Sequence, residues 1–180
     1  MSLNKNTGIL IDRAINELRT GRPIVLGEKG NYWIFYNIEH ATKDIINQFK
    51  IIQDKETYLL ITKQKAKQLS PNKLNSNIFF QVSSNFNHSK FQDLFLNPAN
   101  KTNILNLKNH NLTKSKLFHN YALELSKNAK LIPSLIFKKI NSKFNDDIDS
   151  ILSDLGLLKF KYSDLVNQNK HISDSIKLVS

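Results

Sequence analysis

The side chains best suited to chemistry in this sequence are five histidines and a small group of aspartates. The histidines are widely separated, and no two of them lie three or four residues apart. A helix therefore cannot present two of them on one face as metal ligands. This spacing favours surface or core histidines over a metal centre. The five are His40, His88, His110, His119 and His171.

The densest group of acidic residues is Asp146, Asp147 and Asp149. Carboxylates of this kind can hold a divalent cation. They are also favoured in the first turn of a helix, where they meet the positive end of the helix dipole. Because apolar residues at helical spacing follow at once, we predict a helix start at Asp146 and no metal site.

Other kinds of site are excluded or disfavoured. The absence of cysteine excludes disulfides and thiolate zinc sites. No Gly-Lys-Ser/Thr follows Gly27 and Gly30 into a helix, so these glycines do not form a phosphate-binding loop. Trp33 and the aromatic residues around it could stack a flat ligand. Their alternation along a strand favours packing in the core and at a strand edge instead.

The elements that must position these side chains are clearest at residues 11–38. Apolar residues at helical spacing predict a helix over Asp12–Arg19, with Thr7 as its expected N-cap after a loose tail. Gly21 and Pro23 then end this helix. An apolar run, a turn-forming segment and an aromatic run follow, and they predict a hairpin whose first strand is central in a sheet. These three segments are residues 24–26, 27–31 and 32–38.

Helices alternate with short strands along the rest of the chain, which predicts a single α/β (α+β) domain. The sheet is expected to be mixed because the hairpin joins antiparallel strands. Thr113 is expected to cap the longest helix, and residues 97–111 are expected to form a long loop. The buried side of that helix is predicted to carry Leu117, Phe118, Tyr121, Leu125 and Asn128. Residues 1–170 make up the predicted domain, and residues 171–180 are a linker or the truncated start of a following domain. Further strands are predicted at 58–61, 77–82, 135–140 and 157–162, and further helices at 42–49, 62–69, 89–95, 113–130 and 146–155.

A formal charge of +11 over 180 residues suggests an anionic partner. Arginine recognises phosphates and bases through two parallel hydrogen bonds, but only three of the 26 basic residues are arginine, and the lysines are scattered. A lysine-rich nucleic-acid-binding protein is therefore an alternative that the sequence disfavours. With no run of 18 apolar residues and no signal peptide, we expect a cytoplasmic protein without membrane contact. The three arginines are Arg13, Arg19 and Arg22.

The segment Ala14–Leu26, AINELRTGRPIVL, resembles the start of 3,4-dihydroxy-2-butanone 4-phosphate synthase, an enzyme of riboflavin biosynthesis. Residues 58–69, 121–133 and 158–166 are similar to later parts of that family in the same order. The resemblance thus covers nearly the whole chain. It is similar above all to degenerate copies of the domain that precede GTP cyclohydrolase II in some bacteria.

The catalytic motifs of that family are altered here. The family has an acidic loop after its first strand, roughly D-D-E-D-R-E-N-E-G-D, whose carboxylates hold magnesium. Its place falls on residues 27–31, which keep one carboxylate, Glu28. The family's metal-binding histidine falls on Phe118, one step before His119, and its late acidic residue falls on Lys139. Its Arg-His-Gly-Thr phosphate-binding stretch has no counterpart.

The resemblance therefore implies a folded domain that has lost its activity, with no cofactor, and that serves as a structural or dimerisation module. It further implies a homodimer, as in the active family, and a GTP cyclohydrolase II domain in the same or another chain as a candidate partner. The alternative is an active synthase that uses Glu28, His119 and magnesium to convert ribulose 5-phosphate to dihydroxybutanone phosphate and formate.

Overall fold

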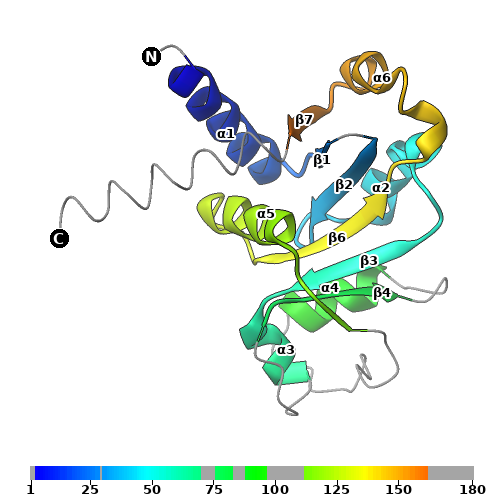
Figure 1. Ribbon diagram of the computed structural model, residues 1–180. Helices are drawn as coiled ribbons and strands as arrows, with labels where there is room; N and C mark the ends of the chain where they lie inside the picture. The colour runs from blue at the N-terminus through cyan, green and yellow to red at the C-terminus, as the bar shows by residue number, and fades with distance from the viewer. Residues whose placement is uncertain (1–2, 29, 70–75, 83–87, 97–111, 162–180) are drawn as a thin grey trace.

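The computed structural model describes residues 3–28, 30–69, 76–82, 88–96 and 112–161, and these form one mixed seven-stranded sheet with helices on both faces (Figure 1). The strand order is β5-β4-β3-β6-β2-β1-β7, and only the β1–β7 pair among the described strands is parallel. The predicted α/β domain with a mixed sheet is confirmed. The strands are β1 (Ile24–Glu28), β2 (Asn31–Asn37), β3 (Thr57–Ile61), β4 (Ile78–Val82), β5 (Thr113–Lys114), β6 (Ser134–Lys139) and β7 (Leu158–Lys161).

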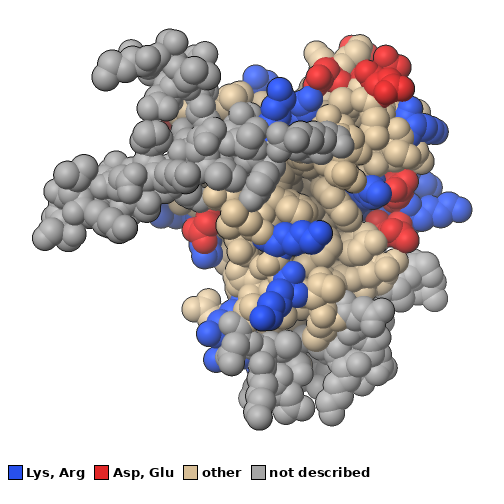
Figure 2. Space-filling model, in the orientation of Figure 1, with Lys and Arg blue, Asp and Glu red and all other residues tan. Residues whose placement is uncertain are grey.

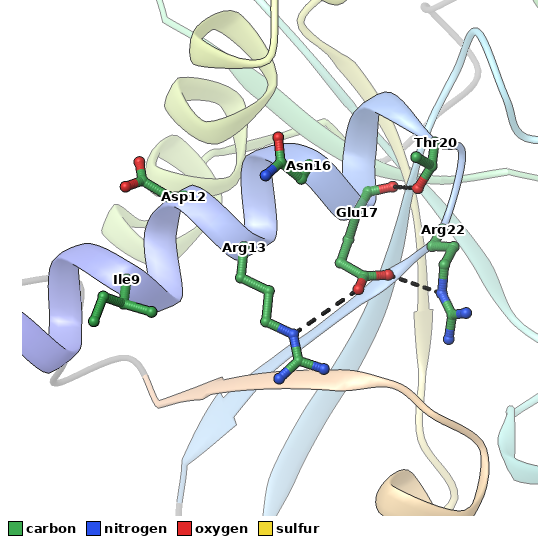
Figure 3. A pocket seen from close by; sticks show the side chains of 7 residues that line it. All are labelled: Ile9, Asp12, Arg13, Asn16, Glu17, Thr20 and Arg22. Atoms are coloured by element: carbon green, nitrogen blue, oxygen red, sulfur yellow. Dashed lines mark hydrogen bonds and ion pairs between the residues drawn. The ribbon is translucent and has the colours of Figure 1, made fainter.

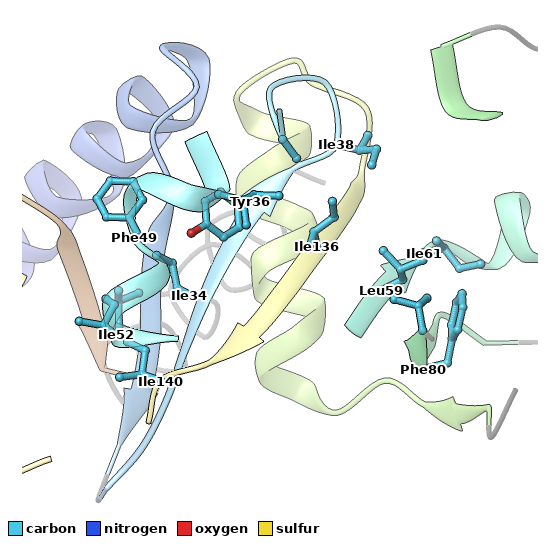
Figure 4. Packing of buried hydrophobic residues seen from close by; sticks show 14 of the residues in the cluster. Ile34, Tyr36, Ile38, Phe49, Ile52, Leu59, Ile61, Phe80, Ile136 and Ile140 are labelled. Carbon is cyan, nitrogen blue, oxygen red and sulfur yellow. The ribbon is translucent and has the colours of Figure 1, made fainter. Parts of the chain in front are cut away.

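Side chains alternate across the sheet and divide the core into two layers. The layer on one face contains residues of α1 and α5, and the layer on the other contains residues of α2, α3, α4 and α6. Figure 4 shows part of the second layer, where Ile34 and Tyr36 of β2 pack beside Ile136 of β6. The helices are α1 (Leu3–Arg19), α2 (Lys43–Gln48), α3 (Lys63–Leu69), α4 (His88–Leu96), α5 (Leu117–Asn128) and α6 (Ile148–Asp154), with 3₁₀ turns η1 (Lys50–Ile52) and η3 (Ser142–Phe144).

The prediction that residues 24–26 form the central strand is wrong. β1 is second from one edge, and β6 holds the middle position. Helices cover both faces of the sheet, so a strand near the edge can be as apolar as a central one. The apolar run therefore indicated burial on both faces correctly but carried no information about strand order.

Two predicted helix starts are also wrong. α1 begins at Leu3 rather than after Thr7, so it is the longest described helix. Thr113 does not cap α5. Its hydroxyl donates to the carbonyl oxygen of Phe79 at 2.7 Å, within the β4–β5 pairing, and α5 begins at Leu117. Leu117 is 53% exposed because it lies in the first turn, facing away from the sheet.

Smaller differences occur at α4 and α6. α4 begins at His88, and the amide of Gln92 donates to the carbonyl oxygens of Ile38 and Glu39. Asp147 rather than Asp146 is the N-cap residue of α6, because the η3 turn comes just before. The predicted loop at 97–111 and the linker at 171–180 lie outside the described residues. No helix in the described ranges has the length and apolar character needed to cross a membrane.

Candidate functional site

The first candidate position is the connection between β1 and β2, where the resemblance places an acidic loop. Glu28 ends β1 and pairs with Asn31, the first residue of β2, so only residues 29 and 30 connect the strands. Gly30 has a φ of +80°, a conformation that glycine adopts readily and that two-residue hairpin turns require. This connection is too short to surround a cation with several carboxylates.

Gly27 makes the hairpin still tighter. A Cβ atom at this position would lie 2.2 Å from the carbonyl oxygen of Asn31 and 2.8 Å from the Cα atom of Tyr32. Both are backbone atoms, which cannot move aside without opening the hairpin. The backbone of β1 and β2 therefore occupies the space in which a larger side chain would lie at residue 27.

The second candidate, His119, lies near the start of α5 and is 3% exposed. Its ring stacks on Phe79 with centroids 3.9 Å apart, and it also contacts Phe118 and Phe137. The backbone N–H of Lys116 donates to Nδ1 of His119 at 3.0 Å, which fixes the first turn of the helix. His119 is thus enclosed by aromatic rings and by its own helix.

The electrostatics of His119 follow from this environment. Burial, helped by the positive charge of Lys116, lowers the pKa of His119 to about 3, so the ring is neutral near pH 7. Because Nδ1 accepts a hydrogen bond, the proton of the neutral ring is on Nε2. Nε2 is buried and has no hydrogen-bond partner within the described part of the chain. Neither nitrogen therefore offers a free lone pair to a metal ion.

The structure does not bring Glu28 and His119 together. His119 contacts Phe79 of β4 and Phe137 of β6, and it therefore lies over β3, the strand between them. β3 is three strand positions from β1, roughly 14 Å at the usual spacing of strands. Trp33 belongs to the same aromatic cluster and packs edge-on against Tyr58, Phe79 and Phe137.

A lysine that the sequence analysis missed is buried in β6. Nζ of Lys138 donates to the carbonyl oxygens of Lys55 and Glu56 at 3.4 and 3.3 Å, and to the hydroxyl of Thr57 at 3.0 Å. Burial lowers the pKa of Lys138, against an opposing effect of Asp54. The sequence did contain a signal for this buried lysine, because Lys138 lies directly after an apolar run within its strand. Lys138 joins β6 to the segment before β3, whereas its neighbour Lys139 pairs with Trp33.

The residues that the structure describes do not fit a magnesium site. No three of their histidine and acidic side chains come close enough to hold a metal ion. The aspartates near α6 are exposed, and Asp149 forms an ion pair with Lys159.

The segment that carries the resemblance most clearly has a structural role. Arg19 donates from Nε to the carbonyl oxygen of Ala129 at 3.2 Å and from Nη2 to that of Asn128 at 3.3 Å, which satisfies two carbonyls at the end of α5. Arg22 donates to the carbonyl oxygen of Gly156, just after α6. A cation at a helix C-terminus also meets the negative end of the helix dipole. The two arginines thus tie the start of the chain to the ends of two later helices.

We expect Arg22→Lys to lower the free energy of unfolding by about 1 kcal/mol, since lysine cannot bond Glu17 and Gly156 simultaneously as the guanidinium does. Arg13→Lys on α1 is the matched control. It makes the same chemical change at an exposed arginine and should change stability by less than about 0.5 kcal/mol. Urea unfolding measures both. Equal stability of the two variants would contradict the role assigned to Arg22.

The outer side of α1 bears an open groove of about 440 Å³ (Figure 3). We call it the α1 groove. It lies along about three turns of the helix and continues to the residue before Pro23. Its lining residues are Ile9, Asp12, Arg13, Asn16, Glu17, Thr20 and Arg22. Elsewhere on the face that Figure 2 shows, basic and acidic side chains are interspersed rather than gathered into one basic patch.

No protein-family model and no curated protein matches the sequence. Solved structures do match. The 3,4-dihydroxy-2-butanone 4-phosphate synthase of Candida albicans has a TM-score of 0.63 at 12% identity, over 88% of this chain and 96% of that one. A synthase in complex with two magnesium ions gives 0.63 at 10% identity, over 89% and 96%. A two-domain synthase from A. baumannii gives 0.60 at 13% identity, over 87% of this chain and 56% of that one. The chain therefore has the fold of 3,4-dihydroxy-2-butanone 4-phosphate synthase.

Proposed function

We propose that this chain is a catalytically inactive domain of the dihydroxybutanone-phosphate-synthase type, connected with riboflavin biosynthesis, that serves as a structural or dimerisation module. The observation that carries the proposal is the two-residue connection between β1 and β2. It stands where the resemblance places a loop of carboxylates. A fold retained without that loop keeps its surfaces and its stability but lacks the groups on which the reaction depends.

The chemistry of the synthase explains why this change matters. The resemblance implies removal of a proton beside a carbonyl and later expulsion of formate, and both steps build negative charge on oxygen. Cations and placed acid–base groups stabilise such charge, and losing one such element typically slows a reaction by about 10²–10³-fold. Here the hairpin keeps one carboxylate, Glu28, and His119 is a buried neutral ring.

The test is an assay of the purified chain with ribulose 5-phosphate and excess magnesium, read as formate release. We expect release at the level of a control without protein, while an active synthase assayed in parallel converts the substrate. Formate well above that control, abolished by Glu28→Gln or His119→Asn, would establish the active-synthase alternative in place of this proposal.

The proposal also names partners. We propose a homodimer, with a GTP cyclohydrolase II domain as the enzyme that the module would support. The fold leaves helix faces and sheet edges at the surface for such contacts, and chemistry at an internal site is not needed for them. Co-purification with a GTP cyclohydrolase II domain, compared with an unrelated zinc enzyme, tests the second partner.

A further inference from the structure

Arg13 differs from the other two arginines because its contact among the described residues is a long, exposed ion pair with Glu17 of its own helix, and it joins no two elements of the fold. Its side chain is 61% exposed, and Nε lies 4.0 Å from Oε1 of Glu17, too far for a hydrogen bond. A lysine would supply the same charge, and lysine is by far the commoner basic residue of this chain. What arginine adds is a planar group that can form two parallel bonds to a carboxylate.

The α1 groove carries both signs of charge in equal number. Asp12 and Glu17 lie on it together with Arg13 and Arg22, so it is locally neutral on a chain with a net charge of +11. An acidic partner would meet the two acids, and a basic partner would meet the two arginines. A surface with this mixture is instead complementary to a copy of itself related by a twofold axis.

Glu17 has one oxygen available for such a contact. Its Oε2 is held by Nε of Arg22 at 2.8 Å, whereas Oε1 has only the long contact with Arg13 among the described residues. Figure 3 shows the side chains of Arg13, Glu17 and Arg22 on the same side of the helix. Ile9, one turn away and 65% exposed, adds apolar surface at the end of the groove.

We propose that the α1 groove is the contact surface for a second copy of this chain, with the two α1 helices antiparallel. Residues 13 and 17 are equally distant from residue 15 along the helix. A twofold axis there places Arg13 of each copy opposite Glu17 of the other, and helices packed about 8–10 Å apart bring these side chains within reach. This inference rests on the proposed role as a dimerisation module and specifies the surface involved.

The test uses charge reversal in the full chain, followed by sedimentation velocity over a range of concentrations. Arg13→Glu alone places two acids opposite each other, and Glu17→Arg alone places two arginines opposite each other. Each variant should self-associate at least about tenfold more weakly than the wild type, because like charges then face each other twice. An equimolar mixture should associate again, since both contacts of the mixed dimer pair opposite charges.

The control is Lys67→Glu on α3, which changes the net charge as Arg13→Glu does but lies away from α1, and it should leave self-association unchanged. Circular dichroism checks that Glu17→Arg folds without its bond to Arg22. Rescue in the mixture supports the proposal, because a folding defect would persist there. If neither charge reversal weakens self-association, the α1 groove is not the contact surface. The proposed role as a dimerisation module would still stand. If the wild-type chain stays monomeric, both the α1 contact surface and the dimerisation role are contradicted. Catalytic inactivity is tested separately, by the assay of formate release.

Discussion

Gly27→Ala is expected to destabilise the domain by about 3 kcal/mol. The added methyl group would lie 2.2 Å from the carbonyl oxygen of Asn31 and 2.8 Å from the Cα atom of Tyr32. Neither is the mobile end of a side chain, so the clash can be relieved only by separating β1 from β2. These strands pair along five residues and connect β7 to the rest of the sheet, so their separation affects the whole domain.

The matched control for this substitution is Gly8→Ala. Gly8 lies inside α1, and a Cβ atom there would meet nothing within 4 Å. Alanine is favoured over glycine in a helix by up to about 1 kcal/mol, so the same chemical change should be neutral or stabilising at residue 8. Urea unfolding of the wild type and both variants measures the difference. A Gly27→Ala protein as stable as the wild type would mean that the hairpin has room to open, and the argument against a loop-like site at residues 28–31 would lose its main support.

The hairpin could be predicted from the sequence because its determinants are local. The turn-forming residues Gly27 and Gly30 lie between an apolar run and an aromatic run, and that pattern indicates two strands that fold back on each other. The order of strands in the sheet has no such local signature. β6 enters between β3 and β2 through contacts between residues far apart in the sequence, and the apolar run of each strand is the same wherever the strand lies.

The roles of the arginines show the same limit. Arg19 bonds a carbonyl 110 residues away, and Arg22 bonds one 134 residues away. The sequence identifies both as part of a motif, but it cannot indicate that their partners are the ends of α5 and α6. His119 is a comparable case. Helical spacing placed its neighbour Phe118 on the buried side, whereas His119 is the more deeply buried of the two, and the hydrogen bond from Lys116 depends on where α5 begins.

The buried state of His119 leads to the second large effect, a loss of stability in acid. The pKa of His119 is about 3 in the folded protein, against an ordinary value of 6.5 for an exposed histidine. Between these two values the unfolded chain binds a proton that the folded protein excludes, so stability rises with pH through this window. The contribution is complete above pH 6.5, where the ring is neutral in both states. It should decrease by up to about 4 kcal/mol as the pH falls from 6.5 to 3.

His119→Asn isolates this effect from the acid sensitivity of the carboxylates. The asparagine oxygen can accept the hydrogen bond from the N–H of Lys116, but the side chain does not titrate. The variant loses aromatic contacts with Phe79, so it should be less stable than the wild type at pH 7. Between pH 6.5 and 4 the free energy of unfolding of the variant should fall less steeply than that of the wild type. The difference between the two slopes should reach about 1.4 kcal/mol for each pH unit. The two curves should therefore converge as the pH is lowered.

Urea unfolding of the wild type and His119→Asn at intervals from pH 8 to pH 4 measures these curves. Parallel curves for the wild type and His119→Asn would mean that the folded protein binds a proton at His119 as easily as the unfolded chain does. The ring would then be accessible and able to exchange protons with a substrate, which is what the active-synthase alternative requires. Converging curves would show that the folded protein keeps His119 neutral, as expected of a core residue that takes no part in acid–base chemistry.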